Sequence, residues 1–276
     1  MTGLQHVPGR PRIAFRQLGE GPPLVFLHGI GGNHGQWADQ QAALSHGFTT
    51  IAWDARGYGA SDDYDGALEF SDFSGDLCRL LDHLKVQCAH LVGLSMGARI
   101  LLDFAPDNLE RIGTLTLCDF FFGFDEALTP EKREEFIALR QKPLREGKSL
   151  SDIAGPLLTS LFGANPSPEA WERMTASMEA LHIESYLKTI AATLRYNRGA
   201  NLERISVPVQ MIFGSEDRLT PPSIGEQAKL RLPDAALSVI QGAGHLSNVE
   251  APQAFNEILG TFLSTHRDRA EWQEGT

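Results

Sequence analysis

The chain has 276 residues, with 24 Lys and Arg against 35 Asp and Glu, and so carries a formal net charge of −11. We expect no binding to nucleic acid, because phosphate contacts need clustered Lys and Arg and the chain has no such cluster. No apolar run approaches the ~20 residues of a membrane-spanning helix, and residues 1–21 lack the apolar segment of a signal peptide.

The first two-fifths of the chain alternate between strand and helix patterns. Short apolar runs predict strands at Arg12–Leu18, Leu24–His28, Thr49–Asp54, His90–Leu94 and Thr114–Cys118. An apolar stripe at helical spacing predicts a helix from Phe70 to Leu84, between the third and fourth of these strands. Strands that alternate with helices predict a mostly parallel sheet covered on both faces, and hence an α/β fold.

The pattern changes after residue 119. From 120 to 201 the sequence predicts helices only, two of which begin at Thr129-Pro130 and Ser167-Pro168. Strands then resume at Val207–Phe213 and Ala236–Gln241, followed by a helix at Pro252–Leu263, while residues 266–276 are expected to be frayed. We predict an α/β core formed by residues 1–119 and 202–276, with residues 120–201 as a helical cap over a site. The alternative is a helical subdomain without such a role.

A serine motif follows the predicted strand at His90–Leu94. The segment Gly93-Leu94-Ser95-Met96-Gly97 is a G-x-S-x-G sequence between this strand and the next helix. On so tight a turn the serine hydroxyl stands clear of the sheet at a helix N-terminus, where backbone amides stabilise developing negative charge. We therefore predict that Ser95 is a nucleophile; the alternative is an ordinary glycine-rich turn.

A nucleophilic serine needs a base and an acid that orients the base. His245 follows the last predicted strand in Gly242-Ala243-Gly244-His245, and we predict that it is the base. Asp119 and Asp217 each follow a strand. The order Ser95, Asp217, His245 is the order of such triads on α/β sheets, so Asp217 is favoured, Asp119 stays an alternative and Glu216 is the third choice.

A glycine loop, His28-Gly29-Ile30-Gly31-Gly32-Asn33, follows the predicted strand at Leu24–His28. Backbone amides of Ile30 and Met96 are predicted to form the oxyanion hole. The loop does not fit a dinucleotide fingerprint, because His34 stands at the third glycine position. The three cysteines contain no C-x-x-C pair. We expect no cofactor, no metal and free thiols in a cytoplasmic protein.

Together with Trp53-Asp54-Ala55-Arg56-Gly57-Tyr58-Gly59-Ala60-Ser61, these motifs resemble the α/β-hydrolase superfamily from Leu24 to Leu263. The chain looks most similar to the branch of 3-oxoadipate enol-lactonases, carboxylesterases and carbon–carbon bond hydrolases. The resemblance implies a structural role for the turn at Asp54–Gly59. It also implies that Ser95 separates the chain from haloalkane dehalogenases and epoxide hydrolases, which carry aspartate there.

Arg99 departs from the family pattern, because many relatives have glycine and an apolar residue where this chain has Ala98-Arg99. A structural ion pair is favoured over a contact with a substrate carboxylate. Aromatic and apolar residues are the candidates for the substrate pocket, although each also suits core packing. They are Trp37, Phe120, Phe121, Phe122, Met174, Tyr186 and Leu219.

We predict a serine hydrolase that cleaves a carboxylic ester or lactone of a small molecule through an acyl-enzyme on Ser95. The same triad would also serve a carbon–carbon bond or amide hydrolase. A small-molecule receptor is the alternative from a different class, and a broken triad would favour it. The partner expected is a small-molecule substrate, with a homodimer left open.

Overall fold

The computed structural model describes residues 3–123, 129–196 and 199–273. The helices and strands before residue 120 are β1 (Gln5–Val7), β2 (Ile13–Leu18), β3 (Pro23–Leu27), α1 (Ala38–Leu44), β4 (Thr49–Trp53), α2 (Ser71–His83), β5 (Val86–Leu94), α3 (Met96–Phe104) and β6 (Ile112–Cys118). Those after residue 205 are β7 (Val209–Gly214), α8 (Pro222–Lys229), β8 (Ala235–Ile240), α9 (Ser247–Glu250), α10 (Pro252–Thr265) and β9 (Glu271–Trp272).

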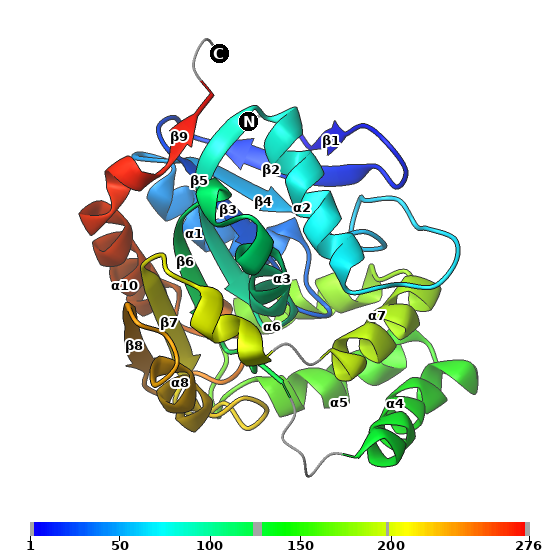
Figure 1. Ribbon diagram of the computed structural model, residues 1–276. Coiled ribbons are helices and arrows are strands. Elements are labelled where there is room, and N and C mark those ends of the chain that lie inside the picture. The colour runs from blue at the N-terminus through cyan, green and yellow to red at the C-terminus, as the bar shows by residue number, and fades with distance from the viewer. Residues whose placement is uncertain (1–2, 124–128, 197–198, 274–276) are drawn as a thin grey trace.

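The strands form one sheet in the order β1-β2-β4-β3-β5-β6-β7-β8 (Figure 1). The strands from β4 to β8 along this order run parallel, whereas β1, β2 and β4 pair antiparallel. Every residue of β3, β4, β6 and β7 is buried. These strands are mostly apolar because a parallel sheet is covered on both faces. The α/β fold and its mostly parallel sheet are thereby confirmed.

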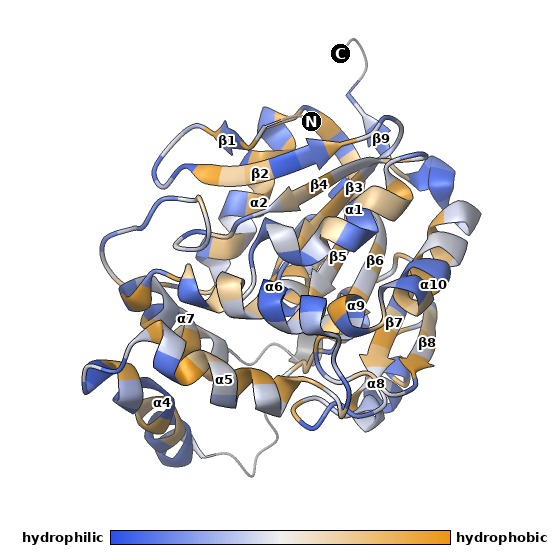
Figure 2. Cartoon of the chain, turned by 180° about the vertical axis from the view of Figure 1, so that it is seen from behind, coloured by the Kyte–Doolittle hydropathy of each residue, from blue (hydrophilic) through white to orange (hydrophobic). Residues whose placement is uncertain are grey.

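Helices cover both faces of the sheet. Helices α2 and α3 lie on one face (Figure 1), and α1, α9 and α10 lie on the other (Figure 2). Helix α10 buries Phe255, Leu259 and Leu263, which are spaced four residues apart, whereas its exposed positions are polar residues such as Glu257 and Thr261. This spacing places one apolar stripe against the core.

Helices α4 (Pro130–Arg145), α5 (Leu150–Leu161), α6 (Pro168–Glu179) and α7 (Ile183–Arg195) form a separate layer beyond the carboxyl ends of the parallel strands (Figure 1). The two helix starts predicted here are present, since Thr129 and Ser167 each accept a backbone hydrogen bond and a proline follows each of them. No strand occurs between 120 and 201 in the part of this segment that the structure describes.

Two strands have no counterpart in the sequence prediction. β1 is the edge strand, and β9 pairs with the start of β5 through Trp272 and Val86. The expectation of a frayed end was therefore wrong for residues 267–272, which form a 3₁₀ turn and β9. Residues 274–276 lie outside the described part.

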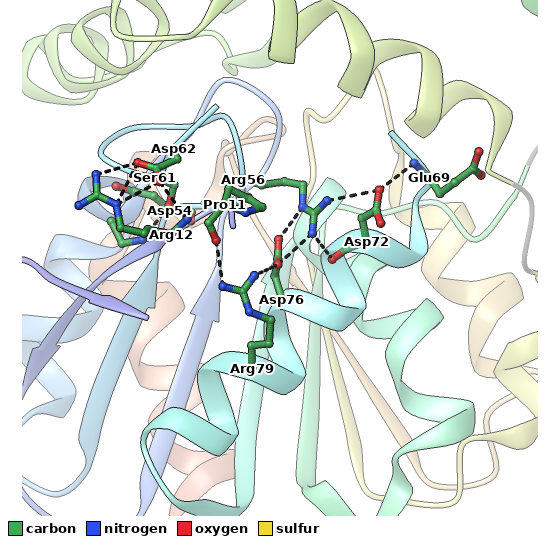
Figure 3. Close-up of polar contacts among 12 residues, drawn as sticks. Pro11, Arg12, Asp54, Arg56, Ser61, Asp62, Glu69, Asp72, Asp76 and Arg79 are labelled. Carbon is green, nitrogen blue, oxygen red and sulfur yellow. Dashed lines mark hydrogen bonds and ion pairs between the residues drawn. The ribbon is translucent and has the colours of Figure 1, made fainter. Parts of the chain in front are cut away.

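The turn from Asp54 to Ser61 is a polar structural unit (Figure 3). The Asp54 carboxylate accepts from the backbone amide of Ala60 at 2.9 Å, and Ser61 Oγ donates to the Asp54 carbonyl oxygen at 2.6 Å. Arg56 in the same turn reaches helix α2, where its Nε donates to Asp76 Oδ2 at 2.6 Å (Figure 3). These bonds fix the turn after β4 to its neighbours, as the resemblance implied.

Candidate active site

Ser95 lies on a strained turn between β5 and α3. Its backbone has φ 52° and ψ −109°, which is unfavourable for a residue with a side chain. The turn is held because the Ser95 amide donates to the carbonyl oxygen of Cys118 at 2.8 Å. A Cβ on Gly97 would lie 2.1 Å from the carbonyl oxygen of Leu27, and one on Gly93 would lie 2.4 Å from the backbone of Gly97. Only glycines permit this close approach of strand and helix.

The glycine loop after β3 lies directly beside the serine. A Cβ built on Gly29 would be 3.3 Å from the Cβ of Ser95, and Ile30 lines the same pocket as Ser95. Met96 is the first residue of α3, so its amide belongs to a helix N-terminus. Ile30 and Met96 thus both lie close to Ser95, and the function of their amides as an oxyanion hole stays a prediction.

His245 and Asp217 meet at the carboxyl end of the sheet. Nδ1 of His245 lies 2.8 Å from Oδ2 of Asp217, and both side chains are buried. Thr220 joins them, because its hydroxyl donates to Asp217 Oδ2 at 2.5 Å and lies 3.1 Å from His245 Nδ1. The other carboxylate oxygen of Asp217 accepts from the amides of Leu219 and Thr220 at 2.8 and 2.9 Å. A proton on Nδ1 fits these acceptors and leaves Nε2 as the basic nitrogen.

His245 and Asp217 stabilise each other's charged forms. Burial alone would lower the pKa of His245, but its hydrogen bond to Asp217 and the charges of Asp217, Asp119 and Glu250 outweigh burial and raise that pKa. Burial alone would raise the pKa of Asp217, and the contacts with His245 and Thr220 reverse this and lower it. The carboxylate is therefore ionised and favours the imidazolium form of His245.

Asp119, the alternative acid, makes a different set of contacts. Its carboxylate accepts from the amide of Gly214 at 2.8 Å and forms a short hydrogen bond with the hydroxyl of Ser247. Burial raises the pKa of Asp119 to about 8, and the nearby charge of Asp217 acts in the same direction. The geometry thus favours Asp217 over Asp119 as the partner of His245.

A pocket lies between the carboxyl ends of the strands and the layer of helices α4–α7 (the cap), and Ser95 and His245 both line it. Among the predicted pocket residues, Phe121, Tyr186 and Leu219 also line it. The prediction was wrong for Trp37 and Phe120, which are fully buried against Phe26 and Phe213 respectively, and Phe122 and Met174 are also absent from the lining. Large aromatic residues fill a core as readily as they line a pocket, so residue type alone did not separate the two.

A family model of the alpha/beta hydrolase fold matches residues 22–252. The chain belongs to this family. It is 30% identical to 3-oxoadipate enol-lactonase 2 of Acinetobacter baylyi, over 86% of this chain and 87% of that protein. It is 29% identical to the 2-hydroxy-6-oxononadienedioate/2-hydroxy-6-oxononatrienedioate hydrolase of Paraburkholderia phymatum, with 91% of each protein covered.

Among solved structures, this alpha/beta hydrolase is similar to the enol-lactonase from Burkholderia xenovorans. The TM-score is 0.83 at 25% identity, with 92% of this chain and 97% of that chain covered. The resemblance stated from the sequence is therefore confirmed for the family and for its enol-lactonase and carbon–carbon hydrolase relatives.

Arg99 of the hydrolase is neither in an ion pair among the described residues nor part of the pocket lining, so the favoured interpretation was wrong. Its guanidinium is fully buried beside the rings of Phe121, at 4.0 Å, and Tyr196, at 4.6 Å. Nη2 donates to the carbonyl oxygen of Tyr196 at 2.9 Å. Burial lowers the pKa of Arg99 to about 9, and contacts with ring faces replace part of its lost hydration.

Three residues of the site were missed from the sequence: Thr220, Arg140 and Glu250. Thr220 stands three residues after Asp217, a spacing at which a hydroxyl reaches a carboxylate, so it was open to prediction. Arg140 lines the pocket from α4, and Glu250 accepts from amides on both sides of His245. Their places depend on how the cap packs, and no local pattern marks them.

Within residues 3–123, 129–196 and 199–273, no group of three or more His, Cys, Asp and Glu side chains is placed to hold a metal ion. In the same residues, every helix is too short or too polar to span a bilayer.

Proposed function

We propose that the protein is a serine hydrolase that cleaves a carboxylic ester or lactone of a small, largely apolar molecule. The observation that carries this proposal is the pairing of His245 with Asp217 at the wall of a pocket that also contains the strained Ser95. A nucleophile, a base held by an acid, and amides beside the nucleophile are the parts that acyl transfer requires.

In the mechanism, Ser95 Oγ attacks the acyl carbonyl carbon while Nε2 of His245 takes its proton. The ionised Asp217 stabilises the imidazolium through Nδ1 and does not itself accept the proton. Amides of Ile30 and Met96 hold the developing oxyanion. Protonation of the leaving oxygen by His245 then releases the alcohol and leaves an acyl-enzyme, and water activated by the same histidine releases the acid.

The substrate class follows from the pocket lining. Four cap residues, Leu157, Leu161, Ile190 and Leu194, supply an apolar wall opposite Ser95. Arg140, an exposed residue on α4, is the one permanently charged side chain of the lining within the described chain. A pocket of this kind favours an apolar acyl or alcohol group with at most one anionic end.

Carbon–carbon bond hydrolysis is the competing reaction. The substrate named for the Paraburkholderia phymatum relative is a dienedioate, which carries two carboxylates. A single arginine in the lining favours the neutral or singly charged esters and lactones over such a dianion.

The test compares wild type and Ser95→Ala on p-nitrophenyl esters of increasing acyl length, on lactones and on a vinylogous diketone with two carboxylates. We expect ester or lactone turnover in the wild type, loss of nearly all turnover in Ser95→Ala, and labelling of Ser95 by a fluorophosphonate. Undiminished turnover by Ser95→Ala would overturn the acyl-enzyme. Preference for the diketone would move the assignment to the carbon–carbon hydrolases, and absence of turnover and labelling in the wild type would favour a receptor.

A further inference from the structure

One carboxylate, that of Glu250, connects the cap to both sides of His245. Its Oε1 accepts from the amides of Gly244 at 3.0 Å and Leu246 at 3.2 Å, which flank the histidine. Its Oε2 accepts at 2.7 Å from the amide of Gly163, which lies in the cap just beyond α5. A single side chain thus satisfies three backbone donors from two parts of the fold that are far apart in sequence.

The surrounding backbone is packed too tightly to take another arrangement. A Cβ on Gly244 would lie 2.4 Å from the amide nitrogen of Gly163 and 2.5 Å from the carbonyl oxygen of Leu161. That carbonyl also accepts from the amide of His245 at 2.7 Å. The end of α5 and the histidine loop therefore lie backbone against backbone, and Glu250 closes the contact.

A second carboxylate nearby, that of Glu216, contacts the cap but not the amides beside His245. Oε2 of Glu216 accepts from the amide of Ala164 at 2.6 Å. The amides of Gly244 and Leu246, which flank His245, donate to Glu250 and not to Glu216. The two glutamates thus share a contact with the cap and differ in their contact with the base.

We propose that Glu250 is a positioning residue for the reaction. Its carboxylate fixes the position of the His245 imidazole relative to the pocket wall that α5 forms. This inference rests on the proposed function, because it requires that His245 is the base. Leu157 and Leu161 of the pocket wall belong to α5, and so a substrate that presses on this helix acts on the backbone that carries the base.

The charge of Glu250 gives the proposal a signature that packing alone does not produce. The carboxyl groups that face His245 are Asp217 from the loop after β7, Asp119 from the end of β6, and Glu250 from α9, and each favours the imidazolium when it is ionised. Burial raises the pKa of Glu250, and the three amides oppose that rise. Removal of its charge lowers the pKa of His245, so the acid limb of kcat/KM moves to lower pH.

The experiment measures kcat, KM and the pH profile of kcat/KM with a p-nitrophenyl ester for wild type, Glu250→Gln, Glu250→Asp and Glu216→Gln. For Glu250→Gln we expect kcat to fall by about 10- to 100-fold, because a small displacement of the base suffices, and the acid limb to move to lower pH. Glu250→Asp keeps the charge but is too short to reach both loops, so kcat falls and the acid limb stays. Glu216→Gln is the matched control, with a raised KM and an unchanged kcat and acid limb.

The outcomes separate this inference from the proposed function. Turnover that survives Ser95→Ala overturns the proposed function itself. If Ser95→Ala is inactive but Glu250→Gln matches the wild type in kcat and in the acid limb, the proposed function stands and only the role of Glu250 is overturned. Equal effects of Glu250→Gln and Glu216→Gln also overturn it, since they would mean that both carboxylates only hold the cap. Should Glu250→Gln fail to fold, the kcat and pH profile of Glu250→Asp decide, because a wild-type kcat in that variant contradicts the proposal.

Discussion

The hydroxyl of Thr220 lies 2.5 Å from Oδ2 of Asp217, the same oxygen that contacts His245. The threonine also caps the loop through its own amide, which donates to the other carboxylate oxygen at 2.9 Å. The acid is thus held by its own loop before it meets the base, and its orientation does not depend on the substrate.

Replacement of Thr220 by valine keeps the shape of the side chain and removes the hydroxyl. We expect kcat to fall by about 5- to 10-fold, the equivalent of one hydrogen bond of about 1 kcal/mol, because Asp217 loses one of its fixed donors. Thr220→Ser retains the donor and is expected to restore most of the activity. Steady-state kinetics with an activated ester measure the effect, and a wild-type kcat in Thr220→Val would contradict the role of the hydroxyl.

The two aspartates near His245 are expected to differ sharply in their effects. Asp217→Asn removes the charge that faces Nδ1 and is expected to lower kcat by about 10³- to 10⁴-fold. Asp119→Asn leaves the His245–Asp217 contact in place and is expected to lower kcat by about tenfold or less, since Asp119 contacts the amide of Gly214 and the hydroxyl of Ser247. If Asp119→Asn lowered kcat more than Asp217→Asn, Asp119 at the end of β6 would be the catalytic acid instead.

The pH dependence follows from the raised pKa of His245. The base must be neutral to accept the serine proton, so kcat/KM falls as pH drops through this pKa, which lies above the ordinary value of 6.5. Burial alone would place the acid limb below that value, and so its position reports the charges of the neighbouring carboxylates. Asp217→Asn is expected to move the residual acid limb to lower pH. A wild-type limb below 6.5 contradicts the balance of charges described for the site.

The turn at Ser95 makes a prediction about stability. A Cβ at Gly97 meets backbone atoms of Leu27, which cannot rotate away, so Gly97→Ala is expected to lower the free energy of unfolding by about 1–3 kcal/mol. Gly155 in α5 has open space where a Cβ would stand, and Gly155→Ala is expected to raise it by about 0.5–1 kcal/mol. Urea unfolding measures both, and a Gly97→Ala variant as stable as wild type would disprove the close approach.

Most of the fold was open to prediction because its buried parallel strands are short, mostly apolar runs. β3 and β6 are buried along their whole lengths, and their sequences carry that signal on their own. β1 and β9 were missed because both are very short, contain exposed residues, and depend on pairing with β2 and β5. Pairing between distant segments has no local signature.

The candidate site divides in the same way. Ser95 and His245 were found because each sits in a glycine-flanked turn after a strand, a pattern contained in a few consecutive residues. Glu250 was missed because its contact with Gly163 joins residues 87 positions apart. The prediction of an ion pair for Arg99 was wrong because its stabilising partners are aromatic rings from other segments. The positive charge of an arginine, taken alone, suggests an acidic partner.

The backbone contact between the end of α5 and the histidine loop sets a rule for building chimeras of this family. An exchange of caps that cuts the chain between α5 and α6 would discard the carbonyl of Leu161 and the amide of Gly163 together. The graft would then leave the amide of His245 without an acceptor and Oε2 of Glu250 without a donor, even if the new helices fitted the core. Junctions placed before α4 and after α7 keep the cap as one block, and the incoming cap must bring a glycine and a free carbonyl to the same two places.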